Sequence, residues 1–283
     1  MLLTSNRVFA FPPACATARW IRWSFKPVLK RKLRFLFRSK SIRIFSTLFV
    51  KADLPNHSTR LYFIRHGEVE HRYHRIFGGS RIDMELSPLG HEHAHALVDW
   101  FGETPLDAVY ASPMLRVHQT AQPLLNARGL APVVMPDLRE VDFGDWTGFR
   151  WHDIQEKFGV QAFDWLELLE NGGMPNGETG NALVSRVRAC LERVLHDNPN
   201  KNVAVVCHGG IVRVMLSLLL GIPLSRMAHF NIDYGSVTIV ELQPEKKHAI
   251  EIELLNFCPL TDRAMARGIN PERQNPQSFP LNK

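Results

Sequence analysis

The chain has 283 residues, of which 45% are hydrophobic, and this suits one large or two small globular domains. No apolar run approaches the roughly 18 residues that a membrane-spanning helix needs. Residues 1–52 hold 12 of the 34 Lys and Arg residues and no acidic residue, which leaves 22 basic against 28 acidic residues in the remainder. The acidic balance of that remainder argues against a nucleic-acid-binding surface.

The basic segment, residues 1–58, is predicted to be an arm outside the folded body. Three interpretations stay open: a disordered extension, an organellar transit sequence, or a basic amphipathic stretch over residues 25–51 that lies on an anionic membrane. No paired spacing links the four cysteines, which are Cys15, Cys190, Cys207 and Cys258. We interpret them as reduced thiols and predict a cytoplasmic protein, with organellar targeting or membrane-surface contact by the arm as alternatives.

From residue 59 onward, short apolar runs alternate with amphipathic stretches. The predicted strands are Leu61–Ile64, Asp107–Ala111, Ala131–Met135, Val203–Cys207, Phe230–Ile232, Val237–Leu242 and Ile250–Leu255. The predicted helices are Ser87–Phe101, Ser112–Gly129, two stretches within Trp151–Glu170, Asn181–His196 and Ile211–Leu220; the first two start at Ser-Pro pairs that are typical of helix caps.

This alternation predicts the fold class α/β, as a three-layer α/β/α sandwich with a mostly parallel central sheet. One domain is expected over residues 59–258. The last segment, residues 259–283, has four prolines and few large apolar residues, so it is predicted to be a loosely ordered tail.

Two predicted strands end in a histidine followed by glycine. These ends carry Arg65-His66-Gly67 and His208-Gly209-Gly210. Arg116 lies one turn into the helix after a third strand. Parallel strands bring their carboxyl ends to one edge of a sheet, so we expect two arginines and two histidines to converge there. Such a set suits a phosphoryl group, because the guanidinium fork binds phosphate oxygens bidentately.

Phosphoryl transfer also needs a nucleophile and a proton for the leaving oxygen. A neutral imidazole can attack phosphorus. Glu140 is the best candidate for an acid kept protonated by burial, because it lies between apolar Leu138 and Val141, and Asp142 is the second choice. Backbone N–H groups of the glycines and two helix N-termini are expected to approach the phosphoryl oxygens.

Five motifs occur in a characteristic order. They are Arg65-His66-Gly67-Glu68, Ala111–Arg116 with Gln119-Thr120-Ala121, Leu138–Gly148, Gly177-Glu178-Thr179 and His208-Gly209-Gly210. Over about residues 60–257 the chain therefore resembles the histidine phosphatase superfamily, in the phosphoglycerate-mutase-like branch that includes the α-ribazole phosphatases. The resemblance implies that His66 becomes phosphohistidine, that Glu140 acts as the acid, and that no metal or cofactor takes part. The phosphoryl group would be bound by Arg65, Arg116, His208, Gly67 and Gly209.

The resemblance leaves the reaction open between a phosphatase and a phosphoglycerate mutase. Mutase members typically carry a longer insertion between the acid and the second histidine than this chain has between Glu140 and His208. Val69 and Arg72 replace a threonine and an asparagine that are frequent in the family. Because the stretch between Glu140 and His208 is short, we predict a metal-independent phosphatase acting on a small phosphorylated metabolite such as α-ribazole phosphate or a sugar phosphate. The oligomeric state stays open.

Two other classes of function are alternatives. His91-Glu92-His93-Ala94-His95 matches the H-E-x-x-H signature of zinc peptidases. Its apolar neighbours are expected to place the histidines at the edge of the buried helix face, which favours an exposed polar face over a metal site. A non-catalytic binding module is the remaining alternative, and retention of both histidines, both arginines and the acid disfavours it.

Overall fold

The computed structural model describes residues 57–161, 164–246 and 249–266. Its six strands form one sheet in the order β3-β2-β4-β1-β5-β6. They are β1 (Thr59–Arg65), β2 (Ala108–Ala111), β3 (Val133–Val134), β4 (Asn202–Cys207), β5 (Val237–Leu242) and β6 (Ile250–Phe257). The strands β3, β2, β4 and β1 pair in parallel, whereas β5 runs antiparallel to both β1 and β6. The sheet is therefore mostly parallel, as predicted.

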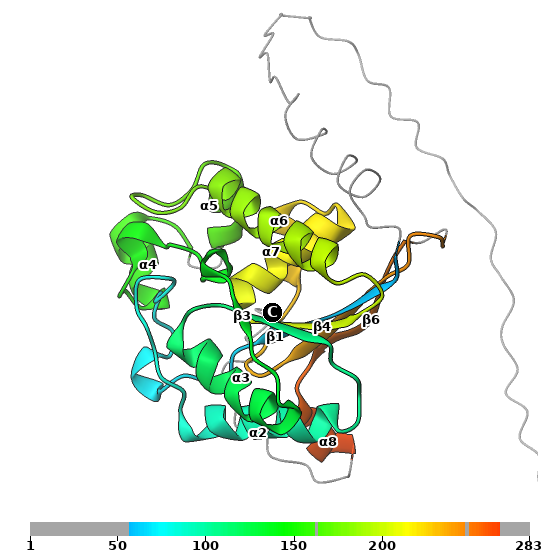
Figure 1. The fold of residues 1–283 in the computed structure, drawn as a ribbon. Coiled ribbons are helices and arrows are strands. Elements are labelled where there is room, and N and C mark those ends of the chain that lie inside the picture. Colours follow the sequence, from blue (N-terminus) through cyan, green and yellow to red (C-terminus); the bar gives the residue numbers. More distant parts are fainter. Residues whose placement is uncertain (1–56, 162–163, 247–248, 267–283) are drawn as a thin grey trace, which may run out of the picture. The chain divides into compact units, whose positions relative to one another are not determined.

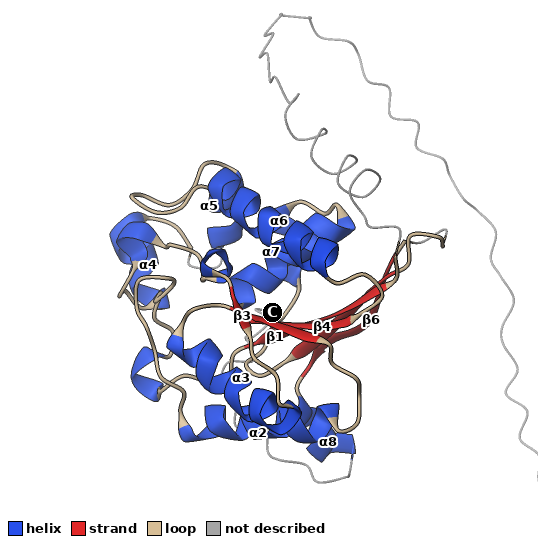
Figure 2. Ribbon diagram, in the orientation of Figure 1, coloured by secondary structure: helices blue, strands red, loops and turns tan. Residues whose placement is uncertain are grey.

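Helices cover both faces of the sheet, which confirms the predicted three layers (Figures 1 and 2). On one face lie α4 (Trp151–Phe158), α5 (Trp165–Glu170), α6 (Gly180–Asp197) and α7 (Gly209–Leu220). On the other face lie α2 (Pro88–Phe101), α3 (Leu115–Arg128) and α8 (Pro259–Ala266).

The central strand β1 shows why its sequence is nearly continuously apolar. Successive side chains of a strand point to opposite faces of the sheet. Leu61 and Phe63 pack into the core beneath α6 and α7, while Tyr62 and Ile64 pack into the core beneath α2 and α3. All four side chains are at most 3% exposed. A parallel strand covered on both faces cannot carry an alternating polar pattern.

The helix after β2 begins later than predicted. Its N-cap is Met114 and its first residue is Leu115, so Ser112 and Pro113 do not cap it. Ser112 is instead fully buried, and its hydroxyl lies 2.8 Å from Nε2 of His208. The Ser-Pro pair therefore ends a strand at the sheet edge and serves a tertiary contact that the local pattern does not reveal.

The predicted strand Phe230–Ile232 is wrong. These residues form a loop between a 3-10 helix, Leu224–His229, and β5. The carbonyl of Phe230 accepts a hydrogen bond from Nε of Arg213, and the carbonyl of Ile232 accepts one from Arg65. Arginine side chains thus take the acceptors that a neighbouring strand would otherwise use.

The predicted loose tail is also wrong over its first eight residues, because Pro259–Ala266 forms α8. Proline suits the first turn of a helix, and the Asp262 side chain accepts the N–H of Cys258 just before it. This helix lies against α2. Residues 267–283, like the basic arm up to residue 56, lie outside the described residues. None of the described helices is long and apolar enough to cross a membrane.

Candidate active site

The candidate site lies at the carboxyl ends of β1, β4 and β2. The register pairs Arg65 with Cys207 and Ala111 with Val206, so the residues that follow each strand emerge at one edge. The N–H of His66 donates to the carbonyl of Cys207 at 3.0 Å, across the β1–β4 pair. Parallel pairing thereby brings together groups that are about 140 positions apart in the sequence.

His66 is 5% exposed, and its ring is held at both nitrogens. Its Nδ1 lies 2.8 Å from the carbonyl of Gly67, which can only accept, so Nδ1 carries the hydrogen. Its Nε2 accepts a hydrogen bond from Nε of Arg116 at 3.3 Å. Burial, followed by the charges of Arg116 and Arg65, holds the pKa of His66 well below its usual range. The ring is therefore neutral near pH 7, with its lone pair on Nε2.

His208 follows β4 and is completely buried. Its ring meets that of His66 edge to face, with 5.3 Å between the ring centroids. Burial lowers the pKa of His208 well below its usual range, and the charge of Arg116 and the neighbouring His66 add to the effect. The site therefore contains two neutral histidines side by side.

Arg116 supplies a buried cation. Its side chain is only 3% exposed, and its guanidinium donates to the carbonyls of Ile82 and Gly79 at 3.2 and 3.0 Å. Burial lowers its pKa from the ordinary value. Among the described residues, the ion pairs include neither Arg116 nor Arg65. A buried cation without a carboxylate partner is costly unless an anion is bound there.

Arg65 is fixed by an aromatic ring. The central carbon of its guanidinium lies 3.9 Å from the centroid of Tyr234, and Nη1 donates to the carbonyl of Ile232 at 2.5 Å. Its Nε is buried and has no hydrogen-bond partner among the described residues. The same Tyr234 ring lies 5.5 Å from that of His66. Arg65 therefore keeps an unused donor beside the nucleophile candidate.

Glu140 reaches the first turn of α7 from the loop after β3. One carboxylate oxygen accepts the N–H of Gly210 at 3.2 Å, and the other accepts the N–H of Val141 at 3.0 Å. A Cβ at position 210 would lie 2.4 Å from Glu140 Oε1, so a larger residue there would displace the Glu140 carboxylate. The second choice for the acid, Asp142, instead forms an ion pair with Arg81 at 2.6 Å.

The loop that carries Glu140 is held by an ion pair that the sequence interpretation did not single out. Arg186 of α6 contacts both carboxylate oxygens of Glu178 at 2.6 and 2.8 Å, with each side chain 9% exposed. The same guanidinium donates to the carbonyls of Asp137, Arg139 and Glu140. This explains structurally why the Gly177-Glu178-Thr179 motif accompanies the site.

The two glycines predicted to contact a ligand differ in what they can offer. The N–H of Gly67 donates to Oγ1 of Thr120 at 2.8 Å, so this donor already has a partner, and contact of Gly67 with a phosphoryl oxygen stays a prediction. Position 67 needs glycine for packing, since a Cβ there would lie 2.5 Å from the carbonyl oxygen of Gly90. Gly209 is the first residue of α7, lies against Arg65 Nε, and has no side-chain cap before it in the described structure.

Four further residues shape the site and were not predicted to do so: Ser112, Thr120, Arg213 and Tyr234. Arg213 donates to the carbonyl of Gly209 at 3.1 Å, and burial next to Arg65 lowers the pKa of Arg213 to about 10. The spacing of four residues between Gly209 and Arg213 on a predicted helix is a sequence signal that could have identified Arg213 as a site residue. Tyr234 lies in an irregular loop, and no local signal marks it.

The zinc-site alternative gains no support from the geometry. His91, Glu92 and His95 are all exposed on α2. Within the part of the chain that the structure describes, no group of three or more His, Cys, Asp or Glu side chains could hold a metal ion. The three residues that would act at a zinc site therefore lie on a solvated helix face, whereas His93 and Ala94 between them are buried.

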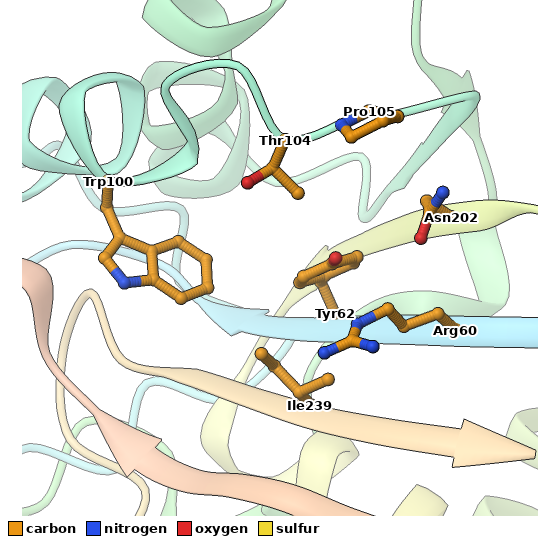
Figure 3. Close-up of a pocket in the computed structure, with 7 residues that line it drawn as sticks. All are labelled: Arg60, Tyr62, Trp100, Thr104, Pro105, Asn202 and Ile239. Atoms are coloured by element: carbon orange, nitrogen blue, oxygen red, sulfur yellow. The ribbon is translucent and has the colours of Figure 1, made fainter.

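A pocket of about 410 Å³ lies away from these residues, at the amino end of β1 (Figure 3). Its lining consists of Arg60, Tyr62, Trp100, Thr104, Pro105, Asn202 and Ile239. The Tyr62 and Trp100 rings meet edge to face at 6.3 Å. None of these side chains is an obvious nucleophile at neutral pH, so the carboxyl end of the sheet remains the candidate site.

Comparison with known proteins agrees with this geometry. Phosphoserine phosphatase 1 of Hydrogenobacter thermophilus is 27% identical over 195 residues, 69% of this chain and 92% of the relative. A phosphoserine-phosphatase-like protein of the same bacterium is 31% identical over 196 residues, 69% of this chain and 96% of the relative. The adenosylcobalamin/α-ribazole phosphatase of Escherichia coli is 28% identical over 183 residues, 65% of this chain and 90% of the relative.

Solved structures show the same fold. The crystal structure of the α-ribazole phosphatase from Shigella flexneri superposes with a TM-score of 0.61 at 27% identity, covering 70% of this chain and 96% of that one. The family model of the histidine phosphatase superfamily (branch 1) matches residues 61–254, which include all five motifs. The predicted resemblance is thereby confirmed, and the chain belongs to branch 1 of the histidine phosphatase superfamily.

Proposed function

We propose that this chain hydrolyses small phosphomonoesters through a phosphohistidine formed on His66. The observation that carries the proposal is the neutral, buried His66 ring, whose Nε2 lone pair faces Arg116 while Nδ1 is tied to the carbonyl of Gly67. A nucleophilic imidazole needs an unprotonated nitrogen. The hydrogen bond at Nδ1 selects the tautomer that leaves this lone pair on Nε2.

In the first step, Nε2 of His66 forms a bond to phosphorus as the ester P–O bond breaks. Glu140, entering the step protonated, gives its proton to the leaving oxygen. In the second step, the Glu140 carboxylate takes a proton from water, the water oxygen bonds to phosphorus, and the P–N bond breaks to release inorganic phosphate. Every step uses side chains of this chain, and the scheme needs no metal or cofactor.

The phosphoryl group is bound by Arg65, Arg116 and His208 in this proposal. Within the part of the chain that the structure describes, neither guanidinium beside His66 forms an ion pair, and the buried Nε–H of Arg65 has no acceptor. A phosphoryl oxygen satisfies such a donor with a charge-assisted hydrogen bond. Gly209 contributes the N-terminus of α7, where the helix dipole favours an anion.

We infer that the substrate is a small phosphorylated metabolite. Relatives named as phosphoserine phosphatases and α-ribazole phosphatases support this class. A phosphoglycerate mutase remains the alternative reaction, and none of the relatives described above carries that name. The cytoplasmic location and the roles considered for the arm stay predictions.

The test is phosphate release from a panel of esters that includes phosphoserine, α-ribazole 5′-phosphate and 3-phosphoglycerate, with and without chelator. We expect chelator-resistant hydrolysis and a ³²P-labelled enzyme that is stable in base and labile in acid, as phosphohistidine is. Conversion of 3-phosphoglycerate to its 2-isomer without phosphate release would identify a mutase instead. Absence of turnover with every ester would refute the proposal.

A further inference from the structure

The second histidine of the site, His208, has a hydrogen-bond pattern that determines its protonation. Its Nε2 lies 2.8 Å from Oγ of Ser112, and both side chains have zero exposure. Its Nδ1 is also buried and has no partner among the described residues. A neutral imidazole carries one hydrogen, on one of these two nitrogens, so the Ser112 contact decides what the other nitrogen can do.

The hydroxyl of Ser112 has few hydrogen-bond partners. In the described residues, its oxygen contacts only Nε2 of His208 and, at 3.5 Å, the N–H of Met114. Met114 N–H is a donor, so it can only give a hydrogen to the serine oxygen. The one acceptor for the Ser112 hydroxyl hydrogen is therefore Nε2 of His208. If Nε2 carried the hydrogen instead, a fully buried hydroxyl hydrogen would have no acceptor, which costs about 1–3 kcal/mol.

We propose that Ser112 is a positioning residue that donates to Nε2 of His208 and so fixes the hydrogen of His208 on Nδ1, as a donor for a phosphoryl oxygen. The part that concerns phosphate rests on the proposed function, whereas the assignment of the tautomer rests on the hydrogen bonds alone. His208 then binds an anion as a neutral donor beside the guanidiniums of Arg65 and Arg116.

The two histidines thus share a tautomer and have opposite roles. His66 turns its Nδ1–H to the carbonyl of Gly67 and keeps its Nε2 lone pair for reaction. His208 turns its Nε2 lone pair to Ser112, and its Nδ1–H has no acceptor among the residues that the structure describes. The different partners, a carbonyl in one case and a hydroxyl in the other, make one ring a nucleophile and the other a donor.

The experiment is a long-range ¹H–¹⁵N NMR spectrum of the full chain with ¹⁵N-labelled histidines, in which the His208 signals are assigned by their loss in His208→Asn. We expect a neutral ring protonated on Nδ1 in the wild type. Ser112→Ala should change this tautomer and weaken the binding of inorganic phosphate about tenfold or more. Ser112→Thr, which keeps the hydroxyl, should retain both properties.

Ser236→Ala is the matched control, because Ser236 is 1% exposed and its hydroxyl has no hydrogen-bond partner in the described structure. It removes a buried hydroxyl without touching His208, and the tautomer and phosphate affinity should not change. A wild-type ring protonated on Nε2, or an unchanged tautomer in a folded Ser112→Ala protein, would overturn the proposal. An Nδ1–H tautomer in a protein that hydrolyses no ester would refute the proposed function alone.

Discussion

The two ends of strand β1 each carry an arginine beside a tyrosine ring, yet within the described residues only the arginine at the amino end has carboxylate partners. At the amino end, Arg60 lies beside Tyr62 (Figure 3), with its guanidinium carbon 5.9 Å from the ring centroid. Arg60 also forms ion pairs with Glu241 and Glu253. At the carboxyl end, Arg65 lies 3.9 Å from the Tyr234 centroid and forms no ion pair among the described residues, although the Nε atoms of both arginines are buried without a hydrogen-bond partner there. The charge of the arginine is therefore neutralised by carboxylates at the amino end and has no such partner, among the described residues, at the carboxyl end.

The difference comes from the neighbouring strands. The antiparallel strands β5 and β6 place two carboxylates beside Arg60, whereas the parallel strand β4 leads into α7, whose first residue, Gly209, lies against Arg65. Helix N-termini and histidines leave the cationic charge uncompensated. An arginine on a strand is therefore a sign of anion binding only when the surrounding elements supply no carboxylate partner.

The largest expected effect comes from removing the nucleophile at the carboxyl end. His66→Ala should reduce phosphate release by about a thousandfold or more and abolish labelling of the enzyme by a ³²P ester. His91→Ala and His95→Ala, which change exposed residues of α2, should keep full activity with and without chelator. Substantial turnover by His66→Ala, or loss of activity in the α2 variants, would contradict the comparison.

The two arginines of β1 give a matched pair of substitutions. Arg65→Ala should lower kcat/KM about a hundredfold, because it removes charge-assisted hydrogen bonds to the phosphoryl group. Arg60→Ala should leave kcat/KM within about twofold of the wild type and cost at most about 1 kcal/mol of stability, since its ion pairs are partly exposed. Steady-state kinetics and urea unfolding measure both effects. Equal losses of activity would show that the two ends of the strand are not distinct.

Substitution of the two tyrosines tests the same comparison, with a smaller expected change in kcat/KM. Tyr234→Leu should lower kcat/KM about tenfold, because the guanidinium of Arg65 loses the ring that holds its plane. Tyr234→Phe keeps the ring and should stay within about threefold of the wild type. Tyr62→Phe, at the other end of the strand, is the control and should not change the kinetics. A Tyr234→Leu enzyme as active as the wild type would exclude a role for this ring.

The smallest effect is a pH dependence of stability that originates at the carboxyl end. The unfolded chain protonates its histidines near pH 6.5, whereas burial keeps the pKa values of His66 and His208 well below that. Below pH 6.5 the unfolded state binds more protons, so the free energy of unfolding should fall with decreasing pH; above it, these groups have no effect.

Denaturant unfolding between pH 5 and 8 measures this slope. His208→Asn should make it shallower, and His91→Asn, on an exposed face, should not change it. The low pKa of His66 also predicts that kcat/KM shows no loss from its protonation at pH 6.5. A steep acidic limb of kcat/KM centred near that pH would contradict the neutral state of the nucleophile.

The sequence alone was sufficient for the architecture and for the convergence of His66, His208 and Arg116 at one edge of the sheet. The apolar runs that end in His66 and His208 predicted parallel buried strands, and parallel pairing makes their carboxyl ends adjacent. That argument depends only on local pattern and on the geometry of a sheet, so the convergence with Arg116 followed directly. The same argument does not place Glu140, because the position of Glu140 depends on a loop held by Arg186 and Glu178.

Only the tertiary structure decided what each polar group does there. The sequence could not show that the N–H of Gly67 is used by Thr120, or that Ser112 contacts His208 instead of capping a helix. Nor could it show the irregular loop in which Tyr234 meets Arg65. Hydrogen-bond partners are set by atoms a few ångströms apart in space and distant in the chain, and periodicity carries no information about them.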